Sequence, residues 1–353
     1  MGAYCPCGTR NYNYKQEMTI VRTPFHWGAL IIGLLALILS PAFLNPVLVD
    51  LINEISIISI AVLGLNILTG FCGQISLGQS AFMGVGAYIA GILAVNFNLN
   101  FLFTLIAGAL GAGIIGVIFG LPSVRIKGFY LAMATLAAQF VIPALISNPL
   151  EPITNGTNSL RIPFPELAGI AFNSPKKMFY IIVPITVLMI YFAENFTRTG
   201  IGRAFVAIRD DDLAANVMGI NIFRYKLLAF FVCSVYAGTA GGLWAYWMRS
   251  INPAHFHLAD SIRYLGMIVV GGMGNVPGTI FGVCFLRVMD HFLREFAMMM
   301  SVFFPAWAPA FQQASTPLLY GLIIVLFLIF EPRGLAHRWE VLKSSWRLRP
   351  FSY

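Results

Sequence analysis

The feature that most constrains this chain is a series of about ten long apolar segments separated by shorter polar ones. These segments are residues 28–44, 48–68, 80–95, 101–121, 128–146, 178–192, 227–247, 261–270, 279–296 and 310–330. A helix of about 20 apolar residues crosses the roughly 30 Å of hydrocarbon in a bilayer, and it satisfies its backbone hydrogen bonds without water. The sequence therefore predicts an all-α, polytopic membrane protein with about ten transmembrane helices. Segment 261–270 is too short to cross alone, so a bent or broken helix is expected there.

The composition excludes an ordinary water-soluble protein. Of the 353 residues, 58% are hydrophobic and only 10% are charged, whereas a soluble domain of this length needs a larger polar surface. The formal net charge of +8 would suggest a nucleic-acid partner in a soluble protein. In a membrane protein it reflects the Lys and Arg residues that gather in cytoplasmic loops, so no nucleic-acid partner is expected.

Basic residues are concentrated in segments that ten spans would place on one side of the membrane. These segments are the tail 1–27, the turn with Arg125 and Lys127, the loop 194–226 and the tail 332–353. The positive-inside rule makes this side cytoplasmic. The expected organisation is a cytoplasmic tail over 1–27, a transmembrane domain over 28–331 with a cytoplasmic loop at 194–226, and a cytoplasmic tail over 332–353. Both termini are then cytoplasmic.

The loop 194–226 contains a polar stretch, GRAFVAIRDDDLAANVMGIN, that predicts one short amphipathic helix. Its charged residues are Arg203, Arg209, Asp210, Asp211 and Asp212, and its apolar side is formed by Phe205, Ile208 and Leu213. Gly219 can end the helix. Such a helix docks in a groove of a soluble partner or lies on lipid headgroups. The three adjacent aspartates favour the partner, because anionic headgroups repel them.

A second group of polar residues surrounds the glycine-rich break Gly70–Gly78 between two apolar segments. The group is Asn66, Gln74, Ser76, Gln79 and Ser80. Broken helices present free backbone groups and often line a substrate path, which makes the five residues candidates for a translocation path. Polar side chains in lipid also hold helices together by hydrogen bonds, and this alternative stays open.

Charged residues inside the spans are few. Glu54 is the one carboxylate clearly within a span, where it could carry a proton or, close to Asp50 and Asn53, lie hydrated near the outer end. A second set has helical spacings that allow pairing: Arg287, Asp290, His291, Arg294 and Glu295. This set predicts either an outer helix end that contacts a partner or a solvated face of mutually neutralising charges.

Two glycines four residues apart, Gly116 and Gly120, form a small-xxx-small pair. Such pairs let helix backbones approach closely in lipid. The pair predicts a tightly packed helix crossing.

Three blocks of the sequence carry specific patterns. Gly202–Asn221 contains Ala214, Ala215 and Gly219 in the spacing Ala-Ala-x-x-x-Gly. The other two are GLNILTGFCGQISLGQSAFMGVGAYIAG (Gly64–Gly91) and GMIVVGGMGNVPGTIFG (Gly266–Gly282). Together they resemble the LivM-type permeases of branched-chain amino acid ABC transporters, in the LivH/LivM permease family. The chain departs from that pattern at Leu213, where Glu is usual, at Gln79, where His is frequent, and at Asn155 and Asn158, which replace glycines.

This resemblance implies the ABC importer permease fold and a transport subunit of the bacterial inner membrane. The subunit would carry branched-chain or similar small amino acids into the cytoplasm. Its partners would be two ATP-binding subunits, a second homologous permease, an extracytoplasmic solute-binding protein and the lipid bilayer. The first block would couple the permease to the ATPases through Arg203, Arg209, Asp210, Asp211, Asp212, Ala214, Ala215 and Gly219.

By the same resemblance the chain is not an enzyme and has no catalytic residue, metal or cofactor of its own, since ATP and Mg²⁺ would be bound by the partner ATPases. The sequence contains no G-x-x-x-x-G-K-[ST] phosphate loop. Two alternatives stay open. One is a permease of the same family for urea or short amides, and the other is an ion-coupled secondary transporter, which would need more embedded charge than Glu54.

Overall fold

Long apolar helices make up most of the described chain, as the hydropathy pattern requires. The computed structural model describes residues 24–124, 129–167, 170–303, 308–331 and 334–347. Each predicted span overlaps one helix: α2 (Pro24–Phe43), α3 (Pro46–Asn66), α4 (Gln79–Phe97), α5 (Phe101–Gly120), α6 (Phe129–Ser147), α8 (Pro175–Arg198), α11 (Ile222–Met248), α12 (Leu258–Gly271), α13 (Val276–Phe303) and α14 (Ala308–Phe330). The helical membrane fold is therefore confirmed.

Within the described residues, seven helical stretches are long and apolar enough to cross a membrane; they lie in α3, α4, α5, α6, α8, α11 and α13. The count of about ten spans stays a prediction. Segment 261–270 lies in α12, whose 14 residues rise only ~21 Å at 1.5 Å per residue. Parts of the predicted cytoplasmic regions lie outside the described residues, namely 1–23, 348–353 and the turn with Arg125 and Lys127.

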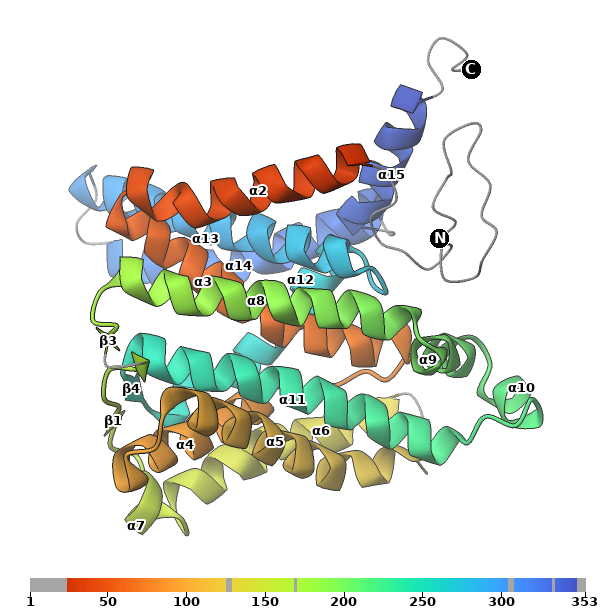
Figure 1. Ribbon diagram of the computed structural model, residues 1–353, viewed down its shortest axis with the longest axis horizontal. Helices are drawn as coiled ribbons and strands as arrows, with labels where there is room; N and C mark the ends of the chain where they lie inside the picture. Colours follow the sequence, from red (N-terminus) through yellow and green to blue (C-terminus); the bar gives the residue numbers. More distant parts are fainter. Residues whose placement is uncertain (1–23, 125–128, 168–169, 304–307, 332–333, 348–353) are drawn as a thin grey trace.

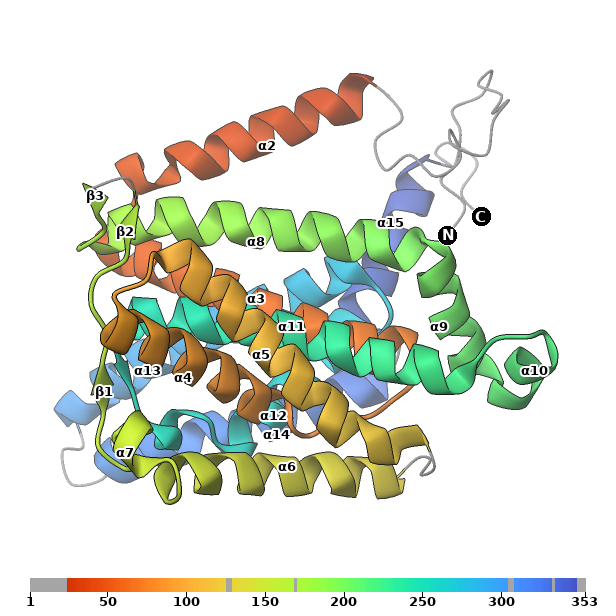
Figure 2. The same cartoon turned by 60° about the horizontal axis from the view of Figure 1, so that its bottom comes forward.

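Short elements occupy the two ends of the bundle (Figures 1 and 2). At one end, called the α10 end here, lie α9 (Gly200–Asp210), α10 (Asp212–Val217) and α15 (Gly334–Arg347), beside the N-terminal end of α2. At the other, the strand end, lie α7 (Glu151–Thr154) and the strands β1 (Leu160–Arg161), β2 (Glu166–Leu167), β3 (Ile170–Ala171) and β4 (Ser250–Ile251). β1 pairs antiparallel with β4, and β2 with β3.

The centre of the bundle is built around α3 and α11, which pack against each other. Helix α11 also packs against α4 and α5, and α3 packs against α8. Every residue of α3 from Ser56 to Asn66 is buried. A helix that is apolar on all sides is expected in such a position. A π-helical turn, Ile67–Phe71, continues α3 to the α10 end, and the glycine-rich break follows it.

Helix α5 has large apolar side chains on its exposed face and small residues on its buried face. Its exposed apolar side chains include Ile106, Leu110, Ile114 and Ile118. Its buried face carries small residues, among them Gly108, Ala112, Gly116 and Gly120. This arrangement suits a membrane, because lipid accepts large apolar groups and small residues let helices pack closely. A methyl group added at Gly116 would overlap the Ser234 side chain of α11, so the predicted tight crossing is confirmed.

Replacing Gly116 by leucine is expected to destabilise the protein by about 1–3 kcal/mol, the usual cost of overpacking a well-packed interior. The measurement is the melting temperature of the purified protein in detergent. Gly321→Leu in α14 is the matched control, because an added methyl group there meets no atom within 4 Å. Equal melting temperatures for the two variants would contradict the packing argument.

Candidate functional site

The polar stretch in loop 194–226 forms two helices that meet at Asp211, so the prediction of a single helix is wrong. Asp211 has an extended backbone, with φ −157° and ψ 110°. Its carboxylate accepts hydrogen bonds from the backbone N–H groups of Leu213 and Ala214 at 2.9 and 3.1 Å. Aspartate is a favoured N-cap because it satisfies such first-turn donors. The middle aspartate therefore ends α9 and starts α10.

Gly219 ends α10, as the sequence predicted. Its φ is +85°, a left-handed conformation that glycine adopts without the cost other residues incur. The N–H groups of Gly219 and Ile220 donate to the carbonyl oxygens of Asn216 and Ala215, both at 3.0 Å. This is the Schellman pattern. Helix α10 is thus fixed at both ends, although it has only six residues.

The apolar side chains of the two helices face different surroundings. Phe205 and Ile208 of α9 are buried, with the Phe205 ring 5.8 Å from that of Phe196. They pack inside this chain and do not form the predicted outward contact face. At α10, however, Leu213, Val217 and Met218 are 70%, 87% and 82% exposed. These three side chains are called the α10 patch. Because α10 projects from the bundle (Figure 2), the patch is open to a partner.

Arg209 connects α9 to the end of α3. Its Nη1 donates to the carbonyl oxygen of Gly70 at 2.8 Å, and its Nε and Nη2 donate to Asp210 Oδ1 at 3.1 Å. Gly70 lies in the π-helical turn that continues α3. The coupling residue predicted from the loop therefore contacts the first of the two segments around the glycine-rich break.

Asn66 extends this contact to the turn between α12 and α13. Its Oδ1 accepts from the N–H of Gly274 at 2.9 Å, and its Nδ2 donates to the carbonyl oxygen of Asn275 at 3.2 Å. A methyl group added at Gly70 would overlap both Asn66 Oδ1 and Gly274 N. Arg209, Gly70, Asn66, Gly274 and Asn275 are called the Arg209 junction. The junction joins three segments that are far apart in the sequence.

The break before α4 is stabilised by side chains that sequence reasoning missed. Backbone N–H groups of Leu77, Ser80 and Ala81 donate to Thr135 Oγ1, Ser261 Oγ and Gln139 Oε1 at 3.0, 2.9 and 3.0 Å. The first N–H groups of a helix have no partner within the helix, and inside a membrane they need a protein acceptor. One sequence signal could have identified these side chains: the polar residues Thr135 and Gln139 lie four residues apart in an otherwise apolar span.

The five candidates for the translocation path are all buried: Asn66, Gln74, Ser76, Gln79 and Ser80. Two of them hold elements together. Asn66 does so in the Arg209 junction, and Gln79 donates to the carbonyl oxygen of Ala61 at 2.6 Å and accepts from Cys233 Sγ at 3.1 Å. Gln74 Oε1 and Ser80 Oγ are buried without a hydrogen-bond partner among the described residues. The path-lining role of the set stays a prediction.

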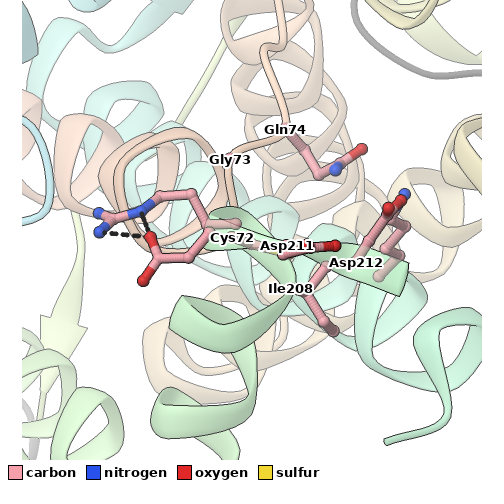
Figure 3. A pocket seen from close by; sticks show the side chains of 9 residues that line it. Cys72, Gly73, Gln74, Ile208, Asp211 and Asp212 are labelled. Carbon is pink, nitrogen blue, oxygen red and sulfur yellow. Dashed lines mark hydrogen bonds and ion pairs between the residues drawn. The ribbon is translucent and has the colours of Figure 1, made fainter. Parts of the chain in front are cut away.

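A polar pocket of about 330 Å³ lies where the break meets the bend between α9 and α10 (Figure 3). Its lining is Cys72, Gly73, Gln74, Ile208, Arg209, Asp210, Asp211, Asp212 and Lys226. Burial raises the pKa of Cys72 to about 12, although the Lys226 ammonium lowers it. The thiol is therefore protonated at neutral pH and a poor nucleophile. The predicted coupling residues Arg209 to Asp212 all lie around this pocket, while Arg203 is exposed on α9.

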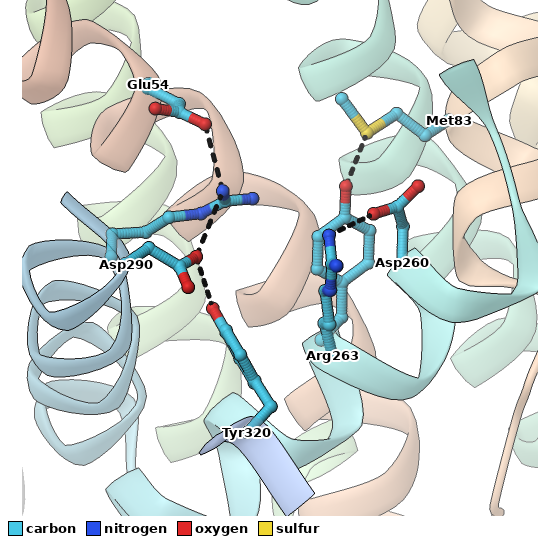
Figure 4. Close-up of polar contacts among 8 residues, drawn as sticks. Glu54, Met83, Asp260, Arg263, Asp290 and Tyr320 are labelled. Atoms are coloured by element: carbon cyan, nitrogen blue, oxygen red, sulfur yellow. Dashed lines mark hydrogen bonds and ion pairs between the residues drawn. The ribbon is translucent and has the colours of Figure 1, made fainter. Parts of the chain in front are cut away.

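A buried ion cluster joins α3, α13 and α14 (Figure 4). Arg287 Nη1 lies 2.9 Å from Glu54 Oε1 and 3.7 Å from Asp290 Oδ2, and the Tyr320 hydroxyl donates to Asp290 Oδ2 at 2.8 Å. Arg287 and Asp290 are only 7% and 4% exposed. The prediction of a solvated face is therefore wrong for these two residues, because Glu54 of a distant helix completes their ion pairs. In the same helix, His291 and Glu295 pair at 3.3 Å in a more exposed position.

Other sequence features have plainer outcomes. Asn155 replaces a glycine of the family pattern described above, and it has a left-handed φ of 68°. Asparagine tolerates this conformation better than most residues. Across the described part of the chain, no group of three or more His, Cys, Asp or Glu side chains could hold a metal ion.

Comparison with known proteins places the chain in a family. A family model described as branched-chain amino acid transport system / permease component matches residues 47–329. The chain is 29% identical over 311 residues to the high-affinity branched-chain amino acid transport system permease protein LivM of Escherichia coli (strain K12), covering 81% of this chain and 69% of that protein. It is 25% identical over 262 residues to a probable LivM protein of Methanocaldococcus jannaschii, covering 72% and 73%.

A third relative is the LivH permease protein of Salmonella typhimurium, 22% identical over 251 residues, which cover 65% of this chain and 79% of that protein. No solved structure matches the chain. The family model spans most of the sequence and includes the glycine-rich break, α9, α10 and the ion cluster. The chain is therefore a member of the family of permease components of branched-chain amino acid transport systems.

Proposed function

We propose that this chain is the permease subunit of an ATP-driven importer that carries branched-chain amino acids across the bacterial inner membrane into the cytoplasm. The observation that carries the proposal is the α10 patch. The six-residue helix α10, fixed at both ends, and the residue that follows it hold three large apolar side chains in the open. Exposed apolar patches on an otherwise folded surface mark binding sites. Family membership and the names of the LivM and LivH relatives support the solute class.

In this proposal the α10 end is cytoplasmic, and so are both termini. Arg198, Arg203, Arg209 and Arg224 belong to this end of the chain, and cytoplasmic segments carry the excess of basic residues. Two ATP-binding subunits dock at the α10 end and bind ATP and Mg²⁺, so this subunit needs no cofactor. A second permease homologous to it completes the membrane unit, and a solute-binding protein docks at the strand end.

The proposed mechanism couples α10 to the glycine-rich break through contacts already described. Closure of the ATP-binding subunits moves α10, and α9 moves with it. The Arg209 junction passes this motion to the end of α3 and to the α12–α13 turn. The break before α4 then changes its packing, and Gln74, Ser76, Gln79 and Ser80 line the path in one of the two states. Such alternation requires that ATP bind the two states with different affinity.

Replacing Val217 by glutamate is expected to weaken association with the ATP-binding subunits at least tenfold. A buried apolar contact would be lost, and hot-spot residues of this kind contribute roughly 2 kcal/mol or more. The measurement is co-purification of the cognate ATP-binding subunits with the tagged permease. Ile153→Glu at the strand end is the control, because Ile153 is also exposed, at 53%. Normal co-purification of the Val217→Glu variant would count against the proposed docking.

Uptake into proteoliposomes tests the function itself. The complete set of subunits is reconstituted with the solute-binding protein, and radiolabelled leucine is offered outside with ATP inside. Leucine accumulation that depends on ATP is expected. Accumulation of urea instead of leucine would contradict the solute class, and accumulation driven by an ion gradient without ATP would contradict the importer.

A further inference from the structure

Helix α15 presents an apolar stripe that runs off the edge of the bundle. Leu335, Trp339 and Leu342 are four and three residues apart, a spacing that places them on one face of a helix. Leu335 packs against the hydrophobic core, whereas Trp339 and Leu342 are 59% and 64% exposed. These three side chains are called the α15 stripe. Because large apolar side chains left in the open mark an interaction surface, the stripe calls for a partner.

The first turn of α15 is fixed to the bundle, and the rest of the helix projects. Ala336 is only 7% exposed, and a methyl group added at Gly334 would overlap the backbone of Gly272. From this attachment α15 leaves at a steep angle to the spans, at the α10 end (Figures 1 and 2). The helix therefore runs across the ends of the spans, along the membrane surface and not along its normal.

The Trp339 side chain joins the stripe to a lipid-facing surface. Its ring centroid lies 6.3 Å from that of Phe281 in α13. Phe281 and Phe292 are 47% and 62% exposed and lie about three helical turns apart on one face of α13, within a stretch long and apolar enough to cross a membrane. Phe281 is five residues, or about 8 Å, from the first residue of that helix. Tryptophan is enriched near this depth, at the boundary between headgroups and hydrocarbon.

The charges around the stripe favour anionic lipid over neutral lipid. Arg338 and Lys343 are exposed, and at ~100° per residue they lie about 70° on either side of the stripe. The stretch 331–349 contains five basic and two acidic residues, although Arg338 also pairs with Glu331. Basic clusters next to a span bind anionic phospholipids, and long basic side chains reach the headgroups while their stems follow the apolar surface. Helix α15 thus has the pattern of an amphipathic helix in the membrane interface.

We propose that α15 is a membrane anchor: the α15 stripe is buried at the boundary between headgroups and acyl chains, and Arg338 and Lys343 contact anionic phospholipid headgroups. The inference requires only that the chain spans a membrane, and not that it docks ATP-binding subunits. The anchor also bears on the Arg209 junction. Gly272, against which Gly334 packs, begins the same α12–α13 turn that carries Gly274, so lipid bound to α15 restrains that turn.

Labelling of two neighbouring positions tests whether the stripe lies in lipid. Leu342→Cys is on the stripe, and the matched control Ser344→Cys is exposed on the opposite face of the helix. Cys5, Cys7 and Cys284 are replaced by alanine, and the other two cysteines are buried. The full chain is placed in nanodiscs of phosphatidylcholine mixed with phosphatidylglycerol, and its reaction with a water-soluble maleimide is timed. Leu342→Cys is expected to react about tenfold more slowly than Ser344→Cys, since burial of an apolar side chain contributes a factor of this size.

A second comparison tests the charge of the lipid. In nanodiscs of phosphatidylcholine alone, the ratio of the two labelling rates is expected to move towards one. Adding Lys343→Gln in the mixed nanodiscs is expected to lower the ratio about fivefold, because one basic residue near an anionic surface contributes about that factor. Arg161→Gln, an exposed residue at the strand end, is the control and is expected to leave the ratio unchanged. A melting temperature equal to that of the wild type shows that each variant is folded.

Three results would overturn the inference. Equal rates for Leu342→Cys and Ser344→Cys in the mixed nanodiscs would show that the stripe lies in water. Equal protection with and without phosphatidylglycerol would refute the contact with anionic headgroups. Protection of Leu342→Cys that appears only after the cognate ATP-binding subunits are added would make the stripe a protein-docking surface. None of these results depends on the outcome for Val217→Glu, so the inference and the proposed function can fail separately.

Discussion

Replacing Arg287 by methionine is expected to lower the free energy of unfolding by about 3–5 kcal/mol, the usual cost of removing one partner from a buried ion pair. Arg287 is 7% exposed, and its guanidinium is shared by Glu54 and Asp290. Without it, two carboxylates remain in the interior with no cation. The measurement is unfolding of the purified protein in mixed micelles, together with the amount of folded protein in the membrane.

Two further variants make this prediction specific. Arg294→Met changes an exposed arginine of the same helix and is expected to stay within about 0.5 kcal/mol of the wild type. The double variant Arg287→Met with Glu54→Leu removes a charge from each side and is expected to recover a large part of the loss, since hydrophobic replacement of a buried pair is often neutral. A single Arg287→Met variant as stable as Arg294→Met would show that the cluster contributes little.

Replacing Arg209 by alanine is expected to reduce ATP-driven leucine uptake by roughly tenfold, within the range of measured coupling free energies, while ATP hydrolysis by the complex continues. The substitution removes the 2.8 Å hydrogen bond to the Gly70 carbonyl, which links α9 to α3. It leaves α10 and its exposed patch unchanged. The two measurements are uptake into proteoliposomes and phosphate release by the same preparation.

The pattern of loss separates coupling from general damage. Arg224→Ala removes an exposed basic residue at the same end of the molecule and is expected to leave both activities near the wild type. Arg209→Lys keeps the charge but lacks the planar fork that reaches Gly70 and Asp210 together, so an intermediate uptake is expected. Equal uptake by Arg209→Ala and Arg224→Ala would falsify the role of the Arg209 junction.

Hydropathy and local glycine chemistry were sufficient to predict the helices and several of their details. Apolar segments of spanning length become long helices, and Gly116 gives a close crossing because no larger residue fits against Ser234. Gly219 ends α10 because a left-handed residue is needed there. The helices and the end of α10 depend on residues that are near one another in the sequence. The close crossing depends on the small size of glycine, whichever residue lies opposite it.

The errors have a common physical cause. The helical pattern continues through Asp210, Asp211 and Asp212, so nothing local distinguishes a charged surface from an N-cap. Asp211 becomes a cap because Phe205 and Ile208 are buried and hold α9 against the core, while α10 turns away from it. Likewise, spacing within one helix shows that Arg287 and Asp290 can pair, but not that Glu54 of α3 completes the pair in the interior.

The candidate site was predicted in part. Its residues around Arg209 and the glycine-rich break were identified from composition and pattern, but their contact was not, since Gly70 and Arg209 meet only in the folded bundle. The roles of Thr135, Gln139 and Ser261 were missed for the same reason. Their oxygens accept from N–H groups of the break and of the first turn of α4, and only the tertiary structure decides which polar residue meets which backbone group.

The pairing of Glu54 with Arg287 also constrains biogenesis. The ribosome delivers α3 to the membrane long before it makes α13, so the carboxylate enters a nonpolar surrounding without its counter-ion. Insertion of a lone acid into lipid is unfavourable, so Glu54 has to stay beside water or other polar groups until α13 arrives. Chains truncated ahead of α13 therefore keep the Glu54 carboxylate without the guanidinium that pairs with it in the complete bundle.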